Sequence, residues 1–231
     1  QDTSGNPASP VPETVNGSEL LLVFHLKMTG RFFVHPPGTA PLKHTRIIFD
    51  LGDSGRLFFD DTRTFGYCRL MYPSELPPWP FWAALGPEPL GIPPAELAAH
   101  FGQSFARRRG PVKNALLDQT VVAGVGNIYA DESLFLARIN PNSRADSIPG
   151  PKLLALAESL QEVLLTSIRE CGSSIRDYRD ALGNAGAFQN SFAVYGKKDG
   201  QCTCCGKTLS SCRLAGRATV YCDRCQTTFT Q

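Results

Sequence analysis

The arrangement of apolar and polar residues changes part-way along this chain of 231 residues. Up to about residue 75, short runs rich in Val, Ile, Leu and Phe are separated by turn residues, a pattern typical of β-strands. It predicts strands in ELLLVFHLKM and FGYCRLMY, and a hairpin in which TRIIFDL and RLFFDD flank the turn GDSG. Residues 1–18 are rich in Pro, Ser, Gly and Asn, so they are predicted to form a loop.

A proline-rich link, PSELPPWPFWAALGPEPLGIPP, separates this section from a helical one. In the helical section, apolar residues recur every three to four positions, as on one face of a helix. Helices are predicted in PPAELAAHFGQSFA, PVKNALLDQ, NIYADESLFLARI and PKLLALAESLQEVLLTSIREC. The last of these has an apolar stripe that is expected to pack in the core: Leu153, Leu156, Leu160, Leu164 and Ile168. Strands followed by helices indicate the α+β class.

The composition is that of a folded protein of one or two domains. Hydrophobic residues make up 42% of the chain and charged residues 19%, which excludes a disordered chain. No apolar run reaches the ~18 residues of a membrane-spanning helix, so we expect no membrane partner. No secretory signal is visible, although the chain begins at Gln1 without an initiator Met.

The net charge is only +2, but the basic residues are clustered. One cluster within seven residues comprises Arg107, Arg108, Arg109 and Lys113. The segment from Lys197 to the end contains six Lys or Arg and only two Asp. Such patches suit a polyanion. On charge alone, ordinary solvated surfaces explain them equally well.

The cysteines give the sharpest signal. Six of the eight lie between Cys202 and Cys225, in the pattern Cys202-x2-Cys205, sixteen residues, Cys222-x2-Cys225. This spacing predicts one structural Zn²⁺ on four thiolates, in preference to the disulfides of a secreted protein. Cys204 and Cys212 are additional thiols in the same segment, and the sequence leaves open whether they compete for the metal.

The segment AGVGNIYADE, from Ala123 to Glu132, breaks the chain and restarts it as a helix. Gly124 and Gly126 permit a tight turn and the close approach of another backbone. Asn127 is placed as the N-cap of the following helix. Because free N–H groups at a helix start attract anions, this turn next to RRRGPVK is predicted to bind a phosphodiester. Without that context, a plain turn between helices would explain it.

Several motifs now show a resemblance to a known family. VVAGVGNIYADESLF resembles the helix–two-turns–helix motif of bacterial formamidopyrimidine-DNA glycosylases, and GRATVYCDRCQ resembles their C-terminal zinc finger. HLKMTG, DTRTFG, LGPEPL and VYGKKDGQC follow in the family's order. The resemblance implies an N-terminal β-sandwich, a helical domain and a zinc-finger β-hairpin, in residues 1–92, 93–196 and 197–231.

The resemblance implies a bifunctional repair enzyme. Such enzymes flip oxidised purines, 8-oxoguanine and formamidopyrimidines, out of duplex DNA, break the glycosidic bond and cleave the strand by β,δ-elimination. Flipping costs unstacking, and side chains must fill the gap. Met28 in HLKMTG, with Arg63 and Phe65 in DTRTFG, matches the family's gap-filling trio. From the residues alone, Met28 and Phe65 would be assigned to the core.

The resemblance also assigns DNA contacts. His25 and Asn127 match phosphate-binding residues, and His44, Arg108 and Lys113 fall along the same DNA-binding strip. Arg217 matches the zinc-finger arginine that binds the phosphate beside the lesion and donates a proton in δ-elimination. Residues Asn184–Asn190 fall where the family has a mobile loop over the flipped purine. The expected partner is double-stranded DNA with an oxidised purine or abasic site, bound by a monomer in the bacterial cytoplasm, at the nucleoid.

The chain departs from the family in one respect. The family uses an N-terminal Pro-Glu pair and a later Lys, and none of these can be matched to this sequence, which opens QDTSG. We therefore expect an incomplete β-sandwich and no catalysis by this sequence alone. Two alternatives stay open: an endonuclease VIII-like enzyme for oxidised pyrimidines, and a non-catalytic zinc module that binds DNA. HLKMTG and DTRTFG favour the purine-repair branch.

Overall fold

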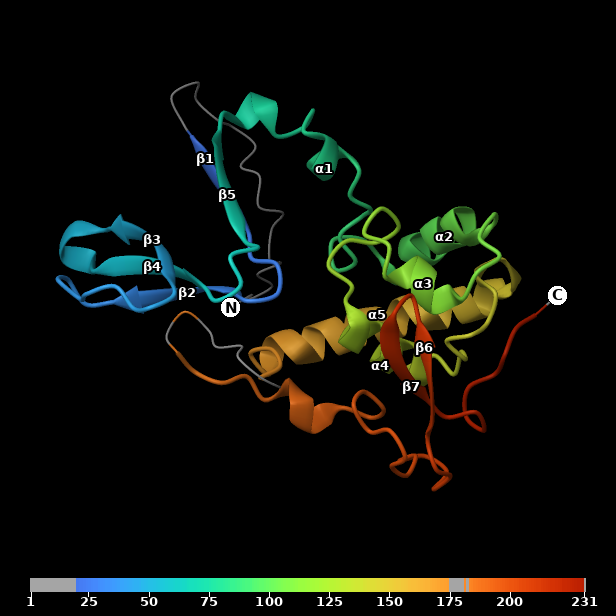
Figure 1. The fold of residues 1–231 in the computed structure, drawn as a ribbon. Coiled ribbons are helices and arrows are strands. Elements are labelled where there is room, and N and C mark those ends of the chain that lie inside the picture. Colours follow the sequence, from blue (N-terminus) through green and yellow to red (C-terminus); the bar gives the residue numbers. More distant parts are fainter. Residues whose placement is uncertain (1–19, 175–180, 182, 231) are drawn as a thin grey trace, which may run out of the picture. The chain divides into compact units, whose positions relative to one another are not determined.

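The computed structural model describes residues 20–174, 181 and 183–230 (Figure 1). The described residues divide into two compact units. One unit comprises 80–166 and 192–230, and the other comprises 20–79 with the described residues of 167–191. No helix in these ranges is long and apolar enough to cross a membrane.

The unit that contains residues 20–79 has two antiparallel sheets. Strand β1 (Leu21–His25) pairs with β5 (Tyr67–Met71), and a second sheet has the order β2 (Gly30–His35), β4 (Arg56–Asp61), β3 (Thr45–Asp50). The predicted hairpin is confirmed as β3–β4. Strand β2 was not predicted, because two adjacent Phe residues after a glycine give no clear alternation.

The two sheets pack against each other through aromatic rings. The ring of Phe24 on β1 lies 4.8 Å from that of Phe32 on β2, 5.8 Å from Phe49 on β3 and 5.4 Å from Phe59 on β4. One side chain of the two-stranded sheet therefore contacts every strand of the other. This is the sandwich arrangement that the family resemblance implied.

The other unit is built from helices. They are α1 (Pro80–Ala83), α2 (Pro94–Phe105), α3 (Val112–Leu116), α4 (Asn127–Leu136) and α5 (Gly150–Arg169). Short 3₁₀ turns occupy Gly52–Ser54, Pro73–Glu75, Ala145–Ser147 and Phe188–Ser191. Helices α2 to α5 correspond to the four predicted ones, and α1 lies inside the segment expected to be a link.

The core of this unit gathers side chains from all four longer helices, with Phe101, Phe105, Leu116 and Leu134 fully buried. The predicted stripe on α5 packs here as far as Leu164. For Ile168 the prediction is wrong, since its side chain is 60% exposed. Ile168 lies past Thr166, where the helix leaves this unit.

The cysteine-rich segment packs on α4. A hairpin of β6 (Ser210–Leu214) and β7 (Arg217–Tyr221) lies between its two cysteine pairs. Phe135 of α4 shares a small core with Val194, Leu209, Val220 and two cysteines. Ala215 and Gly216 connect the strands with φ angles of 47° and 72°, as in the tight turn that suits the strand twist. The α+β class, with sheets, helices and a final hairpin in that order, is therefore confirmed.

Candidate nucleic-acid interface and metal site

Three exposed side chains of the β unit meet at the tips of two loops. Met28 is 75% exposed and Phe65 is 56% exposed, so the assignment of these residues to the core is excluded. The Arg63 guanidinium lies 4.8 Å from the centre of the Phe65 ring, and its Nη1 donates to Sδ of Met28 at 3.2 Å. A cation, an aromatic ring and a flexible thioether therefore form one surface cluster, which we call the probe cluster (Met28, Arg63 and Phe65).

A buried carboxylate shapes both loops. Asp61, at the end of β4, accepts hydrogen bonds from the hydroxyl of Thr29, from the N–H of Arg63 at 3.1 Å and from the N–H of Gly66 at 2.7 Å. Burial alone would raise the pKa of Asp61. The hydrogen bonds from Thr29 and the backbone outweigh burial and hold that pKa below its usual 3.8. Sequence reasoning missed Asp61, although it opens the DTRTFG motif.

Two histidines assigned to DNA contacts lie in the same unit. His25 ends β1, and its Nδ1 accepts the N–H of Lys27 at 3.0 Å. Burial lowers the pKa of His25, and the charge of Lys27 adds to that shift. His44 is half-buried just before β3, and its carbonyl accepts the N–H of Asp61 at 3.0 Å. Both side chains stay candidates for DNA contacts.

In the helical unit, the turn between α3 and α4 is braced by its own side chains. Gln119 accepts the N–H of Gly124 at 2.9 Å and donates to the carbonyl of Val125 at 3.0 Å. Asp118 accepts from the N–H and the hydroxyl of Thr120 at 3.0 and 2.7 Å. The Thr120 hydroxyl contributes most to the lowered pKa of Asp118. The turn is therefore held in shape by hydrogen bonds from its own side chains.

One of the two predictions for this turn is confirmed and the other is wrong. Gly124 has φ of 75°, which needs glycine, as expected. The N-cap of α4, however, is Gly126, in an extended conformation, and Asn127 is the first helical residue. The predicted capping role of Asn127 is therefore wrong. Its Nδ2 instead donates to the carbonyl of Ala218 on β7, at 3.0 Å.

Arg108 and Lys113, both expected on the DNA surface, have different environments. Arg108 is partly exposed and pairs with Asp118 at 2.8 Å. Lys113 is fully buried, and its Nζ lies 2.6 Å from Oδ1 of Asp131. A direct DNA contact by Lys113 is therefore ruled out in this structure, because its ammonium is sealed inside the protein. Burial lowers the pKa of Lys113 and raises that of Asp131 to about 6, while their attraction opposes both shifts.

Arg217 is exposed and is the first residue of β7, directly after the hairpin turn. The carbonyl of the next residue, Ala218, accepts the hydrogen bond from Asn127. This bond connects the strand that carries Arg217 to the turn before α4. The segment that leads into the cysteine module is also fixed to α4. The buried carboxylate of Glu132 accepts the N–H groups of Ala193, Val194 and Tyr195 at 2.7, 2.9 and 2.7 Å.

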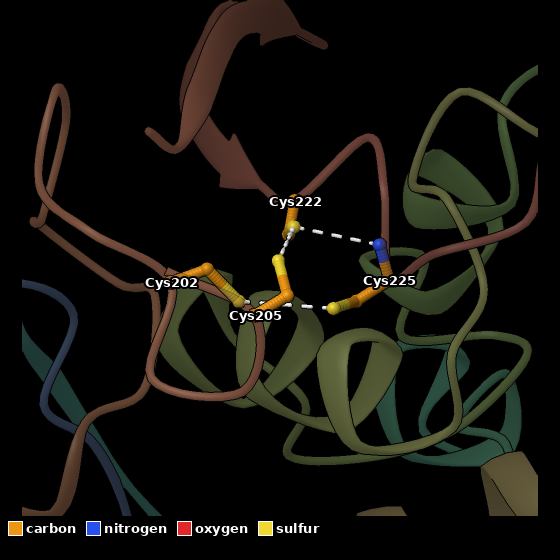
Figure 2. A group of neighbouring side chains, drawn as sticks. All are labelled: Cys202, Cys205, Cys222 and Cys225. Atoms are coloured by element: carbon orange, nitrogen blue, oxygen red, sulfur yellow. Dashed lines mark hydrogen bonds between the residues drawn. The ribbon is translucent and has the colours of Figure 1, made fainter. Parts of the chain in front are cut away.

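The predicted metal ligands come together (Figure 2). The sulfur atoms of Cys202, Cys205, Cys222 and Cys225 all lie within 4.8 Å of one another. Two Sγ–Sγ distances are 3.8 Å, for Cys202–Cys225, and 3.6 Å, for Cys205–Cys222. A tetrahedral Zn²⁺ with bonds of about 2.3 Å places its sulfurs about 3.8 Å apart. The donor set therefore fits one metal ion of this kind.

The two additional thiols point to other partners. Sγ of exposed Cys204 accepts a hydrogen bond from Nη2 of Arg138 at 3.2 Å, and Sγ of Cys212 lies 3.8 Å from Oδ1 of Asn142. Neither belongs to the group of four within the described part of the chain.

The segment Asn184–Asn190 is fixed at several points. Phe188 is buried, and the Gln189 side chain accepts the N–H of Ser174 at 2.8 Å and donates to Gly186 at 2.8 Å. Residues 175–180 and 182, which precede it, lie outside the described residues. The expected role of Asn184–Asn190 over a flipped base stays a prediction.

Comparison with known proteins decides what these elements belong to. Residues 13–68 match the formamidopyrimidine-DNA glycosylase N-terminal domain, and residues 85–179 match the formamidopyrimidine-DNA glycosylase H2TH domain. The chain is 45% identical over 206 residues to the formamidopyrimidine-DNA glycosylase of Desulfitobacterium hafniense, covering 88% of this chain and 74% of that protein. The chain belongs to the formamidopyrimidine-DNA glycosylase family.

Two further relatives of this glycosylase family are similar. The formamidopyrimidine-DNA glycosylase of Nitratidesulfovibrio vulgaris is 58% identical over 205 residues, which are 89% of this chain and 55% of the relative. This chain therefore spans little more than half of that relative. The solved complex of the Lactococcus lactis protein with DNA containing an abasic site has a TM-score of 0.81 and 33% identity, covering 92% of this chain and 77% of that one.

Proposed function

We propose that this protein acts in base-excision repair, as a DNA glycosylase that removes oxidised purines from duplex DNA and cleaves the strand at the resulting abasic site. The family membership and the probe cluster support this activity. The chemical steps need the Pro-Glu pair and the Lys of the family, which match no residue of this sequence. The described residues supply DNA recognition.

The observation that carries the proposal is the contact of Met28 with Arg63 and of Arg63 with Phe65. These two exposed apolar side chains stand at loop tips beside a guanidinium, an arrangement that suits insertion between bases. A flipped base leaves a gap and an unpaired partner base. Met28 would fill the gap, Arg63 would bind the unpaired base and Phe65 would stack beside it.

Phosphate binding would come from the helical unit. The braced turn presents the start of α4, where the first N–H groups have no partner within the helix. Apart from Gly126 and its two chain neighbours, no heavy atom lies within 4 Å of the position that a Cβ would take there, so a phosphate would have room to approach the backbone. Arg217 would bind the phosphate next to the lesion and, as in the family resemblance, donate a proton during δ-elimination. His25, His44 and Arg108 would add contacts along the backbone.

The metal would be one Zn²⁺ on Cys202, Cys205, Cys222 and Cys225. Four thiolates close the coordination sphere, so the ion has a structural role and holds the hairpin that carries Arg217. We also propose the division into residues 1–92, 93–196 and 197–231, and that the protein works as a monomer at the bacterial nucleoid, where its substrate is.

The test is a lesion comparison by fluorescence anisotropy. Four duplexes of the same sequence carry 8-oxoguanine, thymine glycol, a tetrahydrofuran abasic-site analogue or no damage. We expect the 8-oxoguanine and abasic duplexes to bind at least about tenfold more tightly than undamaged DNA, a difference of about 1.4 kcal/mol. A preference for thymine glycol would favour the oxidised-pyrimidine enzyme. Equal affinity for all four would leave only a non-specific DNA-binding module.

A further inference from the structure

The ammonium group of Lys113 lies where three elements meet. It contacts Oδ1 of Asp131 at 2.6 Å and donates to the hydroxyl of Thr219 at 2.8 Å and to the carbonyl of Ala218 at 3.2 Å. Lys113 belongs to α3, Asp131 to α4, and the other two to β7. The ammonium therefore donates two hydrogen bonds to β7 and forms an ion pair with α4.

The same strand is fixed at two further points. The Ala218 carbonyl also accepts Nδ2 of Asn127, at 3.0 Å, and Oδ2 of Asp131 accepts the N–H of Val220 at 3.4 Å. The peptide group next to Arg217 is therefore held both by the buried ammonium and by the turn residue Asn127.

A buried ion pair is a poor way to gain stability. The two side chains are 0% and 1% exposed, so both charges have lost their hydration. Well-packed apolar side chains of similar size would hold α3 and α4 together as well or better. A directional network gives something that apolar packing does not, which is one fixed orientation of β7 relative to the start of α4.

We propose that Lys113 and Asp131 are positioning residues that orient Arg217 and Asn127 so that both bind the same DNA backbone. This inference rests on the proposed function, because it takes phosphate binding by these two residues as given. Lys113 thus acts on DNA through the hairpin, and without the surface contact that its place in the sequence suggested.

A double-mutant cycle tests the inference. Lys113→Met with Asp131→Leu removes both charges and leaves neither unpaired. The affinity for the abasic-analogue duplex is measured with and without Arg217→Ala, across a salt series. In the natural background we expect Arg217→Ala to weaken binding about tenfold, as for loss of a charge-assisted hydrogen bond. It should also reduce the salt slope by about 0.9. In the variant that lacks the Lys113–Asp131 pair, which we call the pair-free background, Arg217→Ala should weaken DNA binding by less than about twofold.

The matched control is the exposed pair Lys207–Asp223, 2.9 Å apart in the same module. Lys207→Met with Asp223→Leu should leave the full effect of Arg217→Ala. Metal content and circular dichroism establish that each variant is folded. Should the pair-free variant lose its metal, the cycle is run on Thr219→Val, which removes one acceptor on β7 and keeps the ion pair.

The outcomes distinguish a failure of the positioning role from a failure of the proposed function. If Arg217→Ala keeps its full effect in the pair-free or Thr219→Val background, the positioning role is overturned, since a residue that only stabilises the fold would give additive effects. If Arg217→Ala has no effect in the natural background, phosphate binding by Arg217 fails, and the proposed function fails at that residue.

Discussion

Nη1 of Arg63 donates to Sδ of Met28 at 3.2 Å, although the two residues are 35 positions apart. The contact joins the loop after β1 to the loop after β4, and the guanidinium also lies 4.8 Å from the centre of the Phe65 ring. The three side chains are therefore held together by contacts within the protein. Ordering side chains in advance lowers the entropic cost of binding.

The first prediction concerns this guanidinium. Arg63→Lys keeps the charge but loses the planar fork that can stack on Phe65 and bind a base edge. We expect about fivefold weaker binding to abasic-analogue DNA and unchanged binding to undamaged DNA, measured by anisotropy. Arg69→Lys is the control, because Arg69 is also exposed and lies 4.8 Å from the ring of Trp79. An equal loss in both variants would show that any stacked arginine matters.

Asp61 gives a prediction about loop shape and pH. Asp61→Ala removes the acceptor for Thr29, Arg63 and Gly66, so the probe cluster should lose its fixed geometry and lesion binding should weaken about tenfold. Because the pKa of Asp61 is lowered in the folded state, its contribution to stability is present above pH ~4 and is lost as the pH falls further.

Lesion discrimination should therefore show no pH dependence from Asp61 between pH 5 and 8. A titration of lesion binding in that range, absent in Asp61→Ala, would contradict the assignment. Asp50→Ala is the control, since Asp50 is an exposed carboxylate in the same sheet.

The braced turn gives a prediction about phosphate binding. Gln119→Ala removes the hydrogen bonds to Gly124 and Val125, so the turn must be ordered when DNA binds. We expect about threefold weaker binding to damaged and undamaged duplexes alike, with an unchanged salt slope, because no phosphate contact is lost. Gln103→Ala, at an exposed position of α2, should have no effect. A loss confined to damaged DNA would place Gln119 in lesion recognition instead.

Metal analysis should find one zinc ion per chain, bound through four thiolates. Cys222→Ser should lose the metal. Its affinity for DNA should fall to that of Arg217→Ala or below, since the metal no longer holds the β6–β7 hairpin in place. Cys204→Ser should keep both metal and binding, because its sulfur lies outside the group of four. Zinc retained in Cys222→Ser but lost in Cys204→Ser would overturn the ligand assignment.

Much of this fold could be predicted because its signals are local. The period of the apolar residues indicates α2 to α5, and the spacing of the four cysteines indicates their meeting point. The exposed state of Met28 could not be predicted, since an apolar residue in a strand-rich segment is more often buried. Only the family resemblance assigned Met28 a role outside the core.

The errors have a common physical cause. Lys113 belongs to a basic cluster in the sequence, yet its charge pairs with Asp131, 18 residues further along. Its ammonium also donates to the hydroxyl of Thr219, 106 residues further along. Asn127 has the residue type of an N-cap, yet its side chain donates a hydrogen bond to the carbonyl of Ala218, 91 residues away. Local propensity cannot show such partners, because they are set by tertiary packing.

The central claim is that the probe cluster recognises damage while the turn and hairpin bind DNA of any sequence. Its most direct measurement is the ratio of affinities for abasic-analogue and undamaged duplexes in Met28→Ala, Asn127→Ala and Leu42→Ala. Leu42 is the control because it is an exposed apolar residue of the same unit, as exposed as Phe65. We expect the ratio to fall at least about fivefold in Met28→Ala and to stay constant in the other two, with Asn127→Ala weakening both affinities. The same ratio in all three variants would contradict the account.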